Sequence, residues 1–236
     1  MRRVGRLVAL ALQEMRQAAR PGMTTAELDA VGADFLLRHG ARSAPQLAYR
    51  FPGFTCISVN EQAVHGVPGA RRLEPGDVVK IDVTAELDGY IADAAVTVLL
   101  PPASSRARRL RDCARQACAV ALQAARAGNA VADIGRAVEE VVVRHGFSVL
   151  RELTGHGVGR ALHEKPAVPN FYSRWTPGTL REGLVLAVEP ILCEEPSRLV
   201  EESDGWTIRT HNRCLAVHWE HTVMITRGAP VVLTEV

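Results

Sequence analysis

The sequence lacks both an excess of one charge sign and an apolar run long enough to cross a bilayer. Only Lys80 and Lys165 are lysines, so arginine supplies nearly all of the positive charge, and the formal net charge is +2. No basic tail is present that could serve for electrostatic docking. Because nothing in the charge balance favours a polyanionic partner, we expect neither direct nucleic-acid binding nor a membrane partner.

The cysteines and the N-terminus lack the marks of an exported protein. The five cysteines include no Cys-x-x-Cys pair, and their odd number argues against a disulfide framework. Two early arginines precede an apolar stretch, as in a signal peptide, but Gln13, Glu14 and Arg16 follow it without a small-residue cleavage site. We therefore expect an amphipathic first helix and a cytoplasmic protein.

Residues 80–93, KIDVTAELDGYIAD, are predicted to form a β-hairpin around the Asp-Gly pair at 88–89, a sequence typical of a type I′ turn. With this turn, Thr84 faces Asp93 across the pair, and Asp82 shares the face of Thr84. The two aspartates then lie about 7 to 8 Å apart. Such a pair is costly unless a cation or hydrogen-bond donors compensate, although solvation on the wet face of an edge hairpin is a simpler explanation.

The chain contains one internal repeat. Residues 20–40 and 126–146 share an arginine, a glycine, an alanine and a final Arg-His-Gly, each displaced by 106 positions. Both segments are predicted to be capped helices that end at the glycine. Residues 73–82 resemble 180–189 at a displacement of 107, which aligns Asp82 with Glu189 and predicts that they lie at equivalent ends of equivalent strands. Two such helix-and-strand units are expected to pack about a pseudo-twofold axis and to bring these acidic residues face to face.

Further residues able to bind protons or metals lie in the second copy. Glycines flank His156 in TGHGVG and allow close backbone approach to an enclosed site, and His163 follows in LHEKP. Glu189 precedes a proline in the apolar strand LAVEPIL. Glu220 is expected in a second apolar strand, CLAVHWEHTVMIT, on the same face as His218. Alternation alone does not show whether that face is wet.

Counting charge links these residues. Asp82, Asp93, Glu189 and Glu220 would bring four negative charges together, and His156 would add a neutral imidazole. Two divalent cations cancel the charges, whereas one cation leaves an excess that is costly to bury. An oxygen-rich set with one imidazole suits Mn²⁺, Fe²⁺, Co²⁺ or Zn²⁺. Two such ions roughly 3.5 to 4 Å apart can hold a bridging hydroxide and polarise a carbonyl, as in aminopeptidases.

Over nearly its whole length the chain resembles the type I methionine aminopeptidases. The motifs that carry the resemblance are CISVNEQAVHGVPG, IDVT with an aspartate eleven residues on, GHGVGRALHEKP, VEP, SDGWTIRT and EHT. The resemblance implies a pita-bread fold of class α+β, with a curved, mainly antiparallel sheet covered by helices. A single catalytic domain, 1–236, would then consist of two pseudo-symmetric halves, roughly 1–105 and 106–236, in agreement with the repeat.

The resemblance also implies roles for individual residues. Two divalent metal ions would be bound by Asp82, Asp93, His156, Glu189 and Glu220, with Asp93 and Glu220 bridging. Glu189 would also be the general base for the metal-bound water.

Outside the metal ligands, the resemblance implies that His163 binds and polarises the scissile carbonyl, and that His65 contacts the substrate and helps to stabilise the tetrahedral intermediate. Phe51, Cys56 and Trp206 would line the methionine pocket, an apolar slot suited to a thioether. Ordinary core packing is the competing interpretation for Cys56 and Trp206. For the two histidines, the competing interpretation is a place in surface loops.

The sequence departs from the family pattern at several positions. Ala94 replaces a hydroxyl residue after the second aspartate, which is expected to remove a hydrogen bond beside Asp93 and to weaken or retune one metal position. Phe54 and the segment 50–52 differ from the usual residues near the pocket, and Lys165 replaces an acidic residue. Because all metal ligands are kept, we expect these departures to affect efficiency and side-chain preference more than reaction type.

The expected function is removal of the initiator methionine from nascent polypeptides whose second residue is small, by a monomer that receives its substrates from the ribosome. Other pita-bread enzymes, namely Xaa-Pro aminopeptidases and prolidases, are the first alternative, although they usually carry a large additional N-terminal domain. Type II methionine enzymes carry a helical insertion for which the segment from Glu189 to Glu220 is too short. A catalytically weakened pita-bread binding protein and a structural protein with coincidental carboxylates are the non-enzymatic alternatives.

Overall fold

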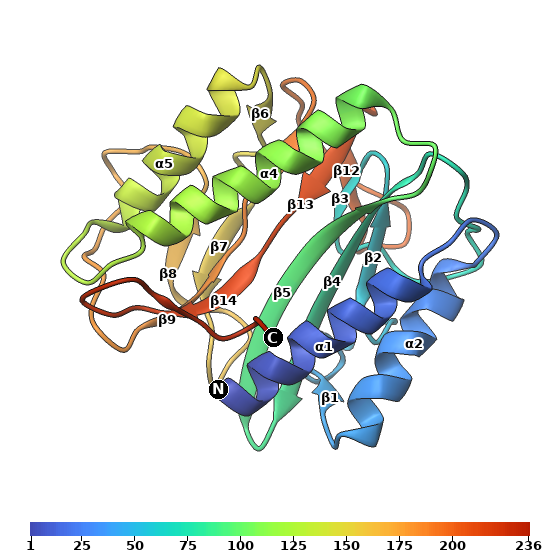
Figure 1. The fold of residues 1–236 in the computed structure, drawn as a ribbon, viewed down its shortest axis with the longest axis horizontal. Coiled ribbons are helices and arrows are strands. Elements are labelled where there is room, and N and C mark those ends of the chain that lie inside the picture. The colour runs from blue at the N-terminus through green and yellow to red at the C-terminus, as the bar shows by residue number, and fades with distance from the viewer.

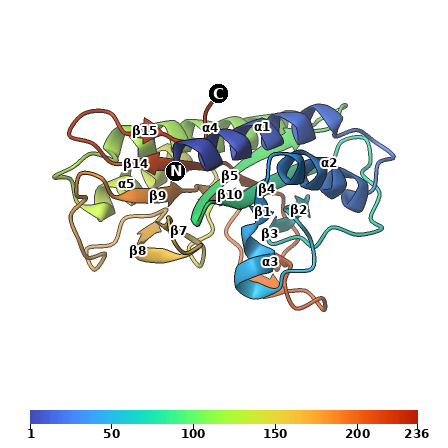
Figure 2. The same cartoon turned by 90° about the horizontal axis from the view of Figure 1, so that it is seen from below.

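The computed structural model describes all residues from Met1 to Val236. Four long helices cover one face of a curved layer of antiparallel sheets, and the short α3 lies on the opposite side (Figures 1 and 2). The helices are α1 (Arg2–Ala18), α2 (Thr25–Arg38), α3 (Ala44–Tyr49), α4 (Ser105–Ala124) and α5 (Val131–Arg144). The mixture of helices with antiparallel sheets confirms the predicted α+β class.

The strands form four small sheets. In the first, β4 (Val78–Leu87) pairs with β1 (Arg42–Ser43), β2 (Cys56–Val59) and β5 (Tyr90–Leu99). The largest has the order β15 (Val231–Val232), β14 (His221–Met224), β9 (Val185–Val188), β7 (Thr154–Gly157) and β8 (Glu164–Pro169). Two three-stranded sheets have the orders β13 (Ala216–His218), β10 (Ile191–Cys193), β6 (Ser148–Val149) and β11 (Leu199–Glu201), β12 (Ile208–Thr210), β3 (Gln62–Val64).

The predicted amphipathic first helix is confirmed. The buried residues of α1 recur every three or four positions and so occupy one face: Val4, Val8, Ala11, Leu12 and Met15. This face packs on α2 and on the hairpin of β4 and β5. None of the helices combines the length and the apolar character that crossing a bilayer would require.

The predicted hairpin is confirmed in both its turn and its register. Asp88 and Gly89 have φ values of 53° and 76°, and a type I′ turn requires a positive φ at both positions. The register pairs Thr84 with Asp93, as the turn predicted. Asp82 therefore lies on the same face of the sheet as Asp93.

The repeated segments have equivalent structures. Both α2 and α5 contain 14 residues and start 106 positions apart, and each is followed by a glycine with a positive φ, Gly40 at 75° and Gly146 at 74°. Their N-termini differ, because Thr24 caps α2 with its hydroxyl whereas Ala130 has no side-chain oxygen. At α5 the Asp133 carboxylate still accepts a hydrogen bond from the Ala130 N–H at 3.0 Å.

Two apolar clusters hold the helices on the sheets. One lies between the helix pair α1 and α2 and the strands β2, β4 and β5. The other lies between α4 and α5 and six strands, β8, β9, β10, β13, β14 and the start of β4. Because apolar burial is concentrated under the helices, polar side chains gather on the other face of the sheets. The division into halves 1–105 and 106–236 stays a prediction, and its boundary falls at the start of α4.

Two acidic residues lie elsewhere than the sequence predicted. Glu220 was expected within a continuous strand, but β13 ends at His218 and β14 begins at His221 in a different sheet. Glu220 therefore occupies the crossing between the two sheets. Asp82 was expected at the end of its strand, but it lies inside β4, which continues to Leu87.

Candidate metal centre and active site

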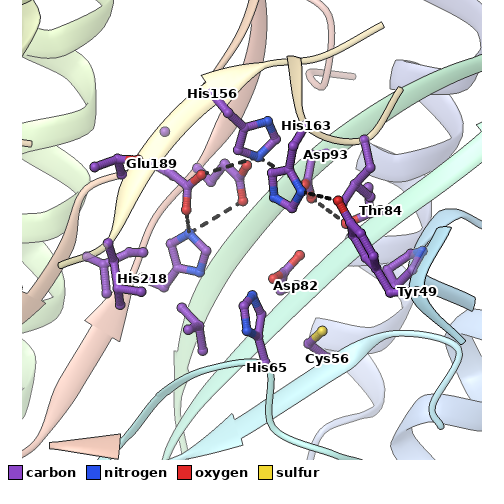
Figure 3. Close-up of a pocket in the computed structure, with 18 of the residues that line it drawn as sticks. Tyr49, Cys56, His65, Asp82, Thr84, Asp93, His156, His163, Glu189 and His218 are labelled. Carbon is purple, nitrogen blue, oxygen red and sulfur yellow. Dashed lines mark hydrogen bonds and ion pairs between the residues drawn. The ribbon is translucent and has the colours of Figure 1, made fainter. Parts of the chain in front are cut away.

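A cavity of about 630 Å³ opens on the face of the sheets that the four long helices leave free. Figure 3 shows its side chains converging from β4, β5, β7 and the neighbouring loops. Each residue predicted from the sequence to act in metal binding, catalysis or substrate binding lines this one cavity: Phe51, Cys56, His65, Asp82, Asp93, His156, His163, Glu189, Trp206 and Glu220. Residues more than 150 positions apart in the chain thus share one site.

Hydroxyl groups hold the backbone and carboxylate of Asp93. Its side chain is 9% exposed, and its Oδ1 accepts a hydrogen bond from the Thr84 hydroxyl at 2.7 Å. The Thr222 hydroxyl donates to the Asp93 carbonyl at 2.7 Å and accepts from its N–H at 2.9 Å. Asp93 is therefore fixed from both halves of the sequence, and its second carboxylate oxygen, Oδ2, points toward His156 at 3.9 Å.

Backbone contacts place the two glutamates. Glu189 directly follows β9, and its carbonyl accepts a hydrogen bond from the buried Asn170 amide at 2.9 Å. The Glu220 N–H donates to the carbonyl of Ala95 on β5 at 2.9 Å. Both side chains are at least nine-tenths buried, at 8% and 2% exposed, so the wet-face interpretation of Glu220 is excluded.

His156 offers one ring nitrogen to the cavity. Its Nδ1 lies 2.9 Å from the Gly157 carbonyl, which is a pure acceptor, so Nδ1 donates its N–H there and Nε2 is the nitrogen left for the cavity. Nε2 lies 3.5 Å from Glu189. The flanking glycines are needed for close packing, because a Cβ would lie 2.4 Å from a backbone oxygen at Gly155 and 2.5 Å at Gly157. The predicted close backbone approach around His156 is confirmed.

The clustered carboxylates destabilise one another's charged forms. Burial raises the pKa of Glu189 from 4.5 to about 8, with Asp93 adding to the rise and His156 opposing it. The pKa values of Asp82 and Glu220 are also raised well above their usual range, mainly by burial and to a smaller extent by the neighbouring carboxylates. Such a set is stabilised by cations, which replace the water that burial removes.

The unpaired atoms of the site fit divalent cations. The buried side-chain atoms without a hydrogen-bond partner are Asp82 Oδ1, Glu220 Oε1 and His218 Nε2, and all three lie in this cavity. Two groups of three residues each bring their ligand atoms within 4.8 Å of one another. One group is Asp93, His156 and Glu220, and the other is Asp82, His218 and Glu220. Carboxylate oxygens and neutral imidazoles are ligands for Zn²⁺, Mn²⁺, Fe²⁺ and Co²⁺.

Two histidines line the cavity wall beside this cluster. Partial desolvation and the neighbouring imidazoles of His156 and His65 lower the pKa of His163 to about 4. Desolvation also lowers the pKa of His65. The backbone of His65 lies in the left-handed region, with a φ of 56°. The ring of His163 lies edge-on to that of His156, with centroids 4.3 Å apart, and its Nδ1 is 2.7 Å from the Tyr49 hydroxyl. Both histidines are therefore neutral at pH 7.

An apolar slot adjoins the acidic cluster. The rings of Phe51 and Trp206 meet edge to face with centroids 5.3 Å apart. Cys56, on β2, pairs directly with Asp82 on β4, and its side chain is buried. Burial and the nearby Asp82 carboxylate raise the pKa of the Cys56 thiol well above its usual range, so it stays a neutral, soft surface.

The sequence did not identify two residues that lie in this site. His218 is 2% exposed, and burial lowers its pKa to about 4, so its imidazole is neutral. The sequence placed His218 two residues before Glu220, on the same face of the expected strand. That spacing would have indicated His218 as a site residue if the face had been known to be buried. Tyr49 contacts His163 across 114 positions, and nothing in the local pattern pointed to it.

The departures from the family pattern have unequal structural consequences. Ala94 is fully buried in the apolar cluster beneath α1, on the face of β5 away from the cavity. The expected loss of a hydrogen bond beside Asp93 is wrong for this chain, because the hydroxyls of Thr84 and Thr222 supply those bonds. Phe54 packs against the same apolar cluster and does not line the cavity, whereas Lys165 does.

Known proteins of similar sequence share one activity in their names. The chain matches Metallopeptidase family M24 over residues 1–227. It is 41% identical to methionine aminopeptidase 2 of Bacillus subtilis (strain 168), with 100% of the chain and 95% of the relative covered. It is 37% identical to a methionine aminopeptidase of Borreliella burgdorferi, with 98% and 92% covered. The chain therefore belongs to metallopeptidase family M24, whose members use divalent metal ions.

Among solved structures of similar fold, a methionine aminopeptidase superposes more closely than a prolidase does. The crystal structure of the Thermotoga maritima enzyme superposes with a TM-score of 0.95 at 35% identity, covering 100% of this chain and 95% of that one. A prolidase from Pyrococcus furiosus gives 0.81 at 22% identity, and only 62% of that chain is covered. The prolidase likeness shows the shared fold alone. The predicted pita-bread fold and the resemblance to methionine aminopeptidases are both confirmed.

Proposed function

We propose that the chain is a methionine aminopeptidase that removes the N-terminal methionine from nascent proteins and peptides when the second residue is small. The observation that carries the proposal is the convergence of four carboxylates and an imidazole beside an apolar slot in one cavity. Relatives named methionine aminopeptidase, 37% and 41% identical over nearly the full chain, support the same reaction.

The donor set would hold two divalent cations, Co²⁺, Mn²⁺, Fe²⁺ or Zn²⁺. Their four positive charges match the four carboxylates, and the proposed ligands are Asp82, Asp93, His156, Glu189 and Glu220. Asp93 and Glu220 would bridge, and Glu220 belongs to both groups of clustered ligand atoms. When bound, the ions would supply Lewis acidity that activates water and polarises the scissile carbonyl.

Glu189 would accept the proton of the attacking water and deliver it to the leaving amine. Its carboxylate is fixed at the end of β9 and lies 3.5 Å from His156 Nε2. Burial alone raises its pKa to about 8, and nearby cations would lower that pKa again. The carboxylate would then be ionised at neutral pH and able to take up the proton.

His163 and His65 would hold the substrate at its scissile peptide. As neutral imidazoles each can donate one N–H to the carbonyl oxygen as negative charge develops there. The Tyr49 hydroxyl, 2.7 Å from His163 Nδ1, fixes the His163 ring and leaves its Nε2 facing the cavity. No charged side chain is then needed to stabilise the oxyanion from this side.

Phe51, Cys56 and Trp206 would receive the methionine side chain. Two aromatic rings and a neutral thiol give an unbranched thioether dispersion contacts without a polar group to satisfy. We also infer that the enzyme works as a cytoplasmic monomer on chains that emerge from the ribosome, without direct contact with nucleic acid or membrane. The near-neutral charge balance supports the absence of direct contact with nucleic acid or an anionic membrane.

A substrate competition tests the proposed specificity. The protein is loaded with Co²⁺ or Mn²⁺ and given Met-Ala-Ser and an Xaa-Pro dipeptide in separate assays. We expect release of methionine from Met-Ala-Ser with little cleavage of the proline bond. Preferential cleavage of the Xaa-Pro bond would replace the proposal with a prolidase-like activity, which the shared fold also allows.

A further inference from the structure

We infer that His218 is a sixth metal ligand, which together with Asp82 and Glu220 gives the second metal position an imidazole of its own. The inference rests on the proposed dimetal site and extends its ligand set. The sequence motifs alone provide a single imidazole, His156, for the whole centre. With His218, each of the two positions would have one nitrogen ligand.

His218 is buried without a hydrogen bond to its inward-facing nitrogen. Its side chain is 2% exposed, and Nε2 has no hydrogen-bond partner in the protein. The nearest carboxylate oxygens, on Glu220 and Glu189, lie 3.4 and 3.5 Å away (Figure 3). Leaving a buried polar atom unpaired is costly, whereas a leucine of similar size would carry no such cost. The imidazole is therefore unexplained as a packing residue.

The backbone aims this side chain at the cavity. The Thr97 hydroxyl accepts a hydrogen bond from the His218 N–H at 3.0 Å and donates one to the His218 carbonyl at 2.7 Å. On the other side, β13 pairs His218 with Ile191 of β10. With its backbone held by β5 and β10 and its side chain 2% exposed, the ring is enclosed beside the acidic cluster.

The atoms that lack partners in the protein belong to one group. Asp82, His218 and Glu220 have ligand atoms within 4.8 Å of one another, and these three residues carry every unpaired buried side-chain atom. Ligands bound tetrahedrally at about 2.1 Å lie about 3.4 Å apart, so small side-chain rotations close the group around an ion. The other group, Asp93, His156 and Glu220, is distinct except for the shared Glu220.

A second imidazole changes which metals the centre favours. Nitrogen ligands suit Zn²⁺, Co²⁺ and Fe²⁺, whereas a position formed by oxygens alone suits Mn²⁺. With His218 as a ligand, the second position gains a nitrogen donor, which increases its preference for Zn²⁺ and Co²⁺ over Mn²⁺. We therefore expect Zn²⁺ and Co²⁺ to bind both positions more tightly than Mn²⁺ does.

X-ray absorption spectroscopy of the Zn²⁺-loaded wild-type protein tests the ligand set without any substitution. We expect two Zn²⁺ per chain and an average of one imidazole per ion, whereas five-ligand coordination gives one imidazole per two ions. Two bound ions with a single imidazole between them would overturn the inference and leave the proposed function intact. A chain that binds no divalent ion would instead overturn the proposed function.

Calorimetric titration of metal-free variants with Co²⁺ gives a second test. His218→Gln should weaken one of the two binding steps by about tenfold or more and leave the other step unchanged. His221→Gln is the matched control, because His221 bonds to Thr234 and does not line the cavity. Equal Co²⁺ affinities in wild type and folded His218→Gln protein would refute the assignment.

Discussion

Removal of metal should make the stability of this protein fall as pH rises. In the metal-free protein the pKa of Glu189 is raised by burial from 4.5 to about 8. A carboxyl group whose folded-state pKa is raised stabilises the fold fully below its unfolded pKa and loses that contribution as pH rises to the folded value. The loss therefore falls between pH 4.5 and about 8. The raised pKa values of Asp82 and Glu220 act in the same direction.

The size of the effect follows from the same pKa values. A rise from 4.5 to about 8 corresponds to about 5 kcal/mol for Glu189 at 1.36 kcal/mol per pH unit. This is comparable to the whole unfolding free energy of many domains. Bound divalent cations remove the penalty, because they stabilise the ionised carboxylates. The metal-loaded protein should therefore show little of this dependence.

The pH dependence of the unfolding free energy is measured by urea denaturation from pH 5 to pH 8, with and without a chelator. We expect the unfolding free energy of the chelated protein to drop by several kcal/mol across this range. Glu189→Gln should remove much of the drop, whereas Glu140→Gln, at an exposed position without an ion pair, should leave it unchanged. A chelated protein whose stability is constant or rises from pH 5 to pH 8 would refute the reasoning.

Three further substitutions test individual contacts. Tyr49→Phe removes the hydrogen bond to His163, and we expect kcat/KM for Met-Ala-Ser to fall about tenfold in a folded protein; an unchanged value would show that the hydroxyl does not position the ring. Trp206→Ala removes one wall of the apolar slot, so KM should rise more than kcat falls, and an unchanged KM would exclude Trp206 from the slot. Lys80→Met removes an amino group from a residue that is 1% exposed and has no ion pair. The amino group donates to the carbonyls of Asn60 and Val78, and each of these carbonyls also accepts a backbone N–H, so neither loses its last donor. Urea denaturation should give an unfolding free energy higher by about 1 to 3 kcal/mol at pH 7. Because burial lowers the Lys80 pKa, the difference should shrink toward pH 10.5, and a destabilised variant would contradict this.

Local chemistry made much of the site predictable. The Asp-Gly turn fixed the hairpin register, and the register placed Asp82 and Asp93 on one face before any tertiary contact was known. The repeat then identified Glu189 as the counterpart of Asp82, and charge counting required cations. These inferences succeeded because turn geometry and strand alternation are local properties that the chain retains in the fold.

The remaining parts depend on tertiary packing. Alternation could not show which face Glu220 and His218 occupy, because the chain passes from one sheet to another between β13 and β14. The Tyr49 contact with His163 joins segments without a common local pattern. At Ala94 the sequence indicated a lost hydrogen bond, but hydroxyls of β4 and β14 already donate to the carboxylate and the carbonyl of Asp93. Such contacts become visible only when distant strands are placed together.

Methionine release from Met-Ala-Ser by the chelated and metal-restored protein is the most direct measurement. We expect no release without metal, release restored by Co²⁺ or Mn²⁺, and almost none from folded Glu189→Gln protein at saturating metal. Methionine release at an undiminished rate after complete metal removal, or wild-type turnover by Glu189→Gln, would contradict a metal-dependent reaction that uses Glu189 as its base.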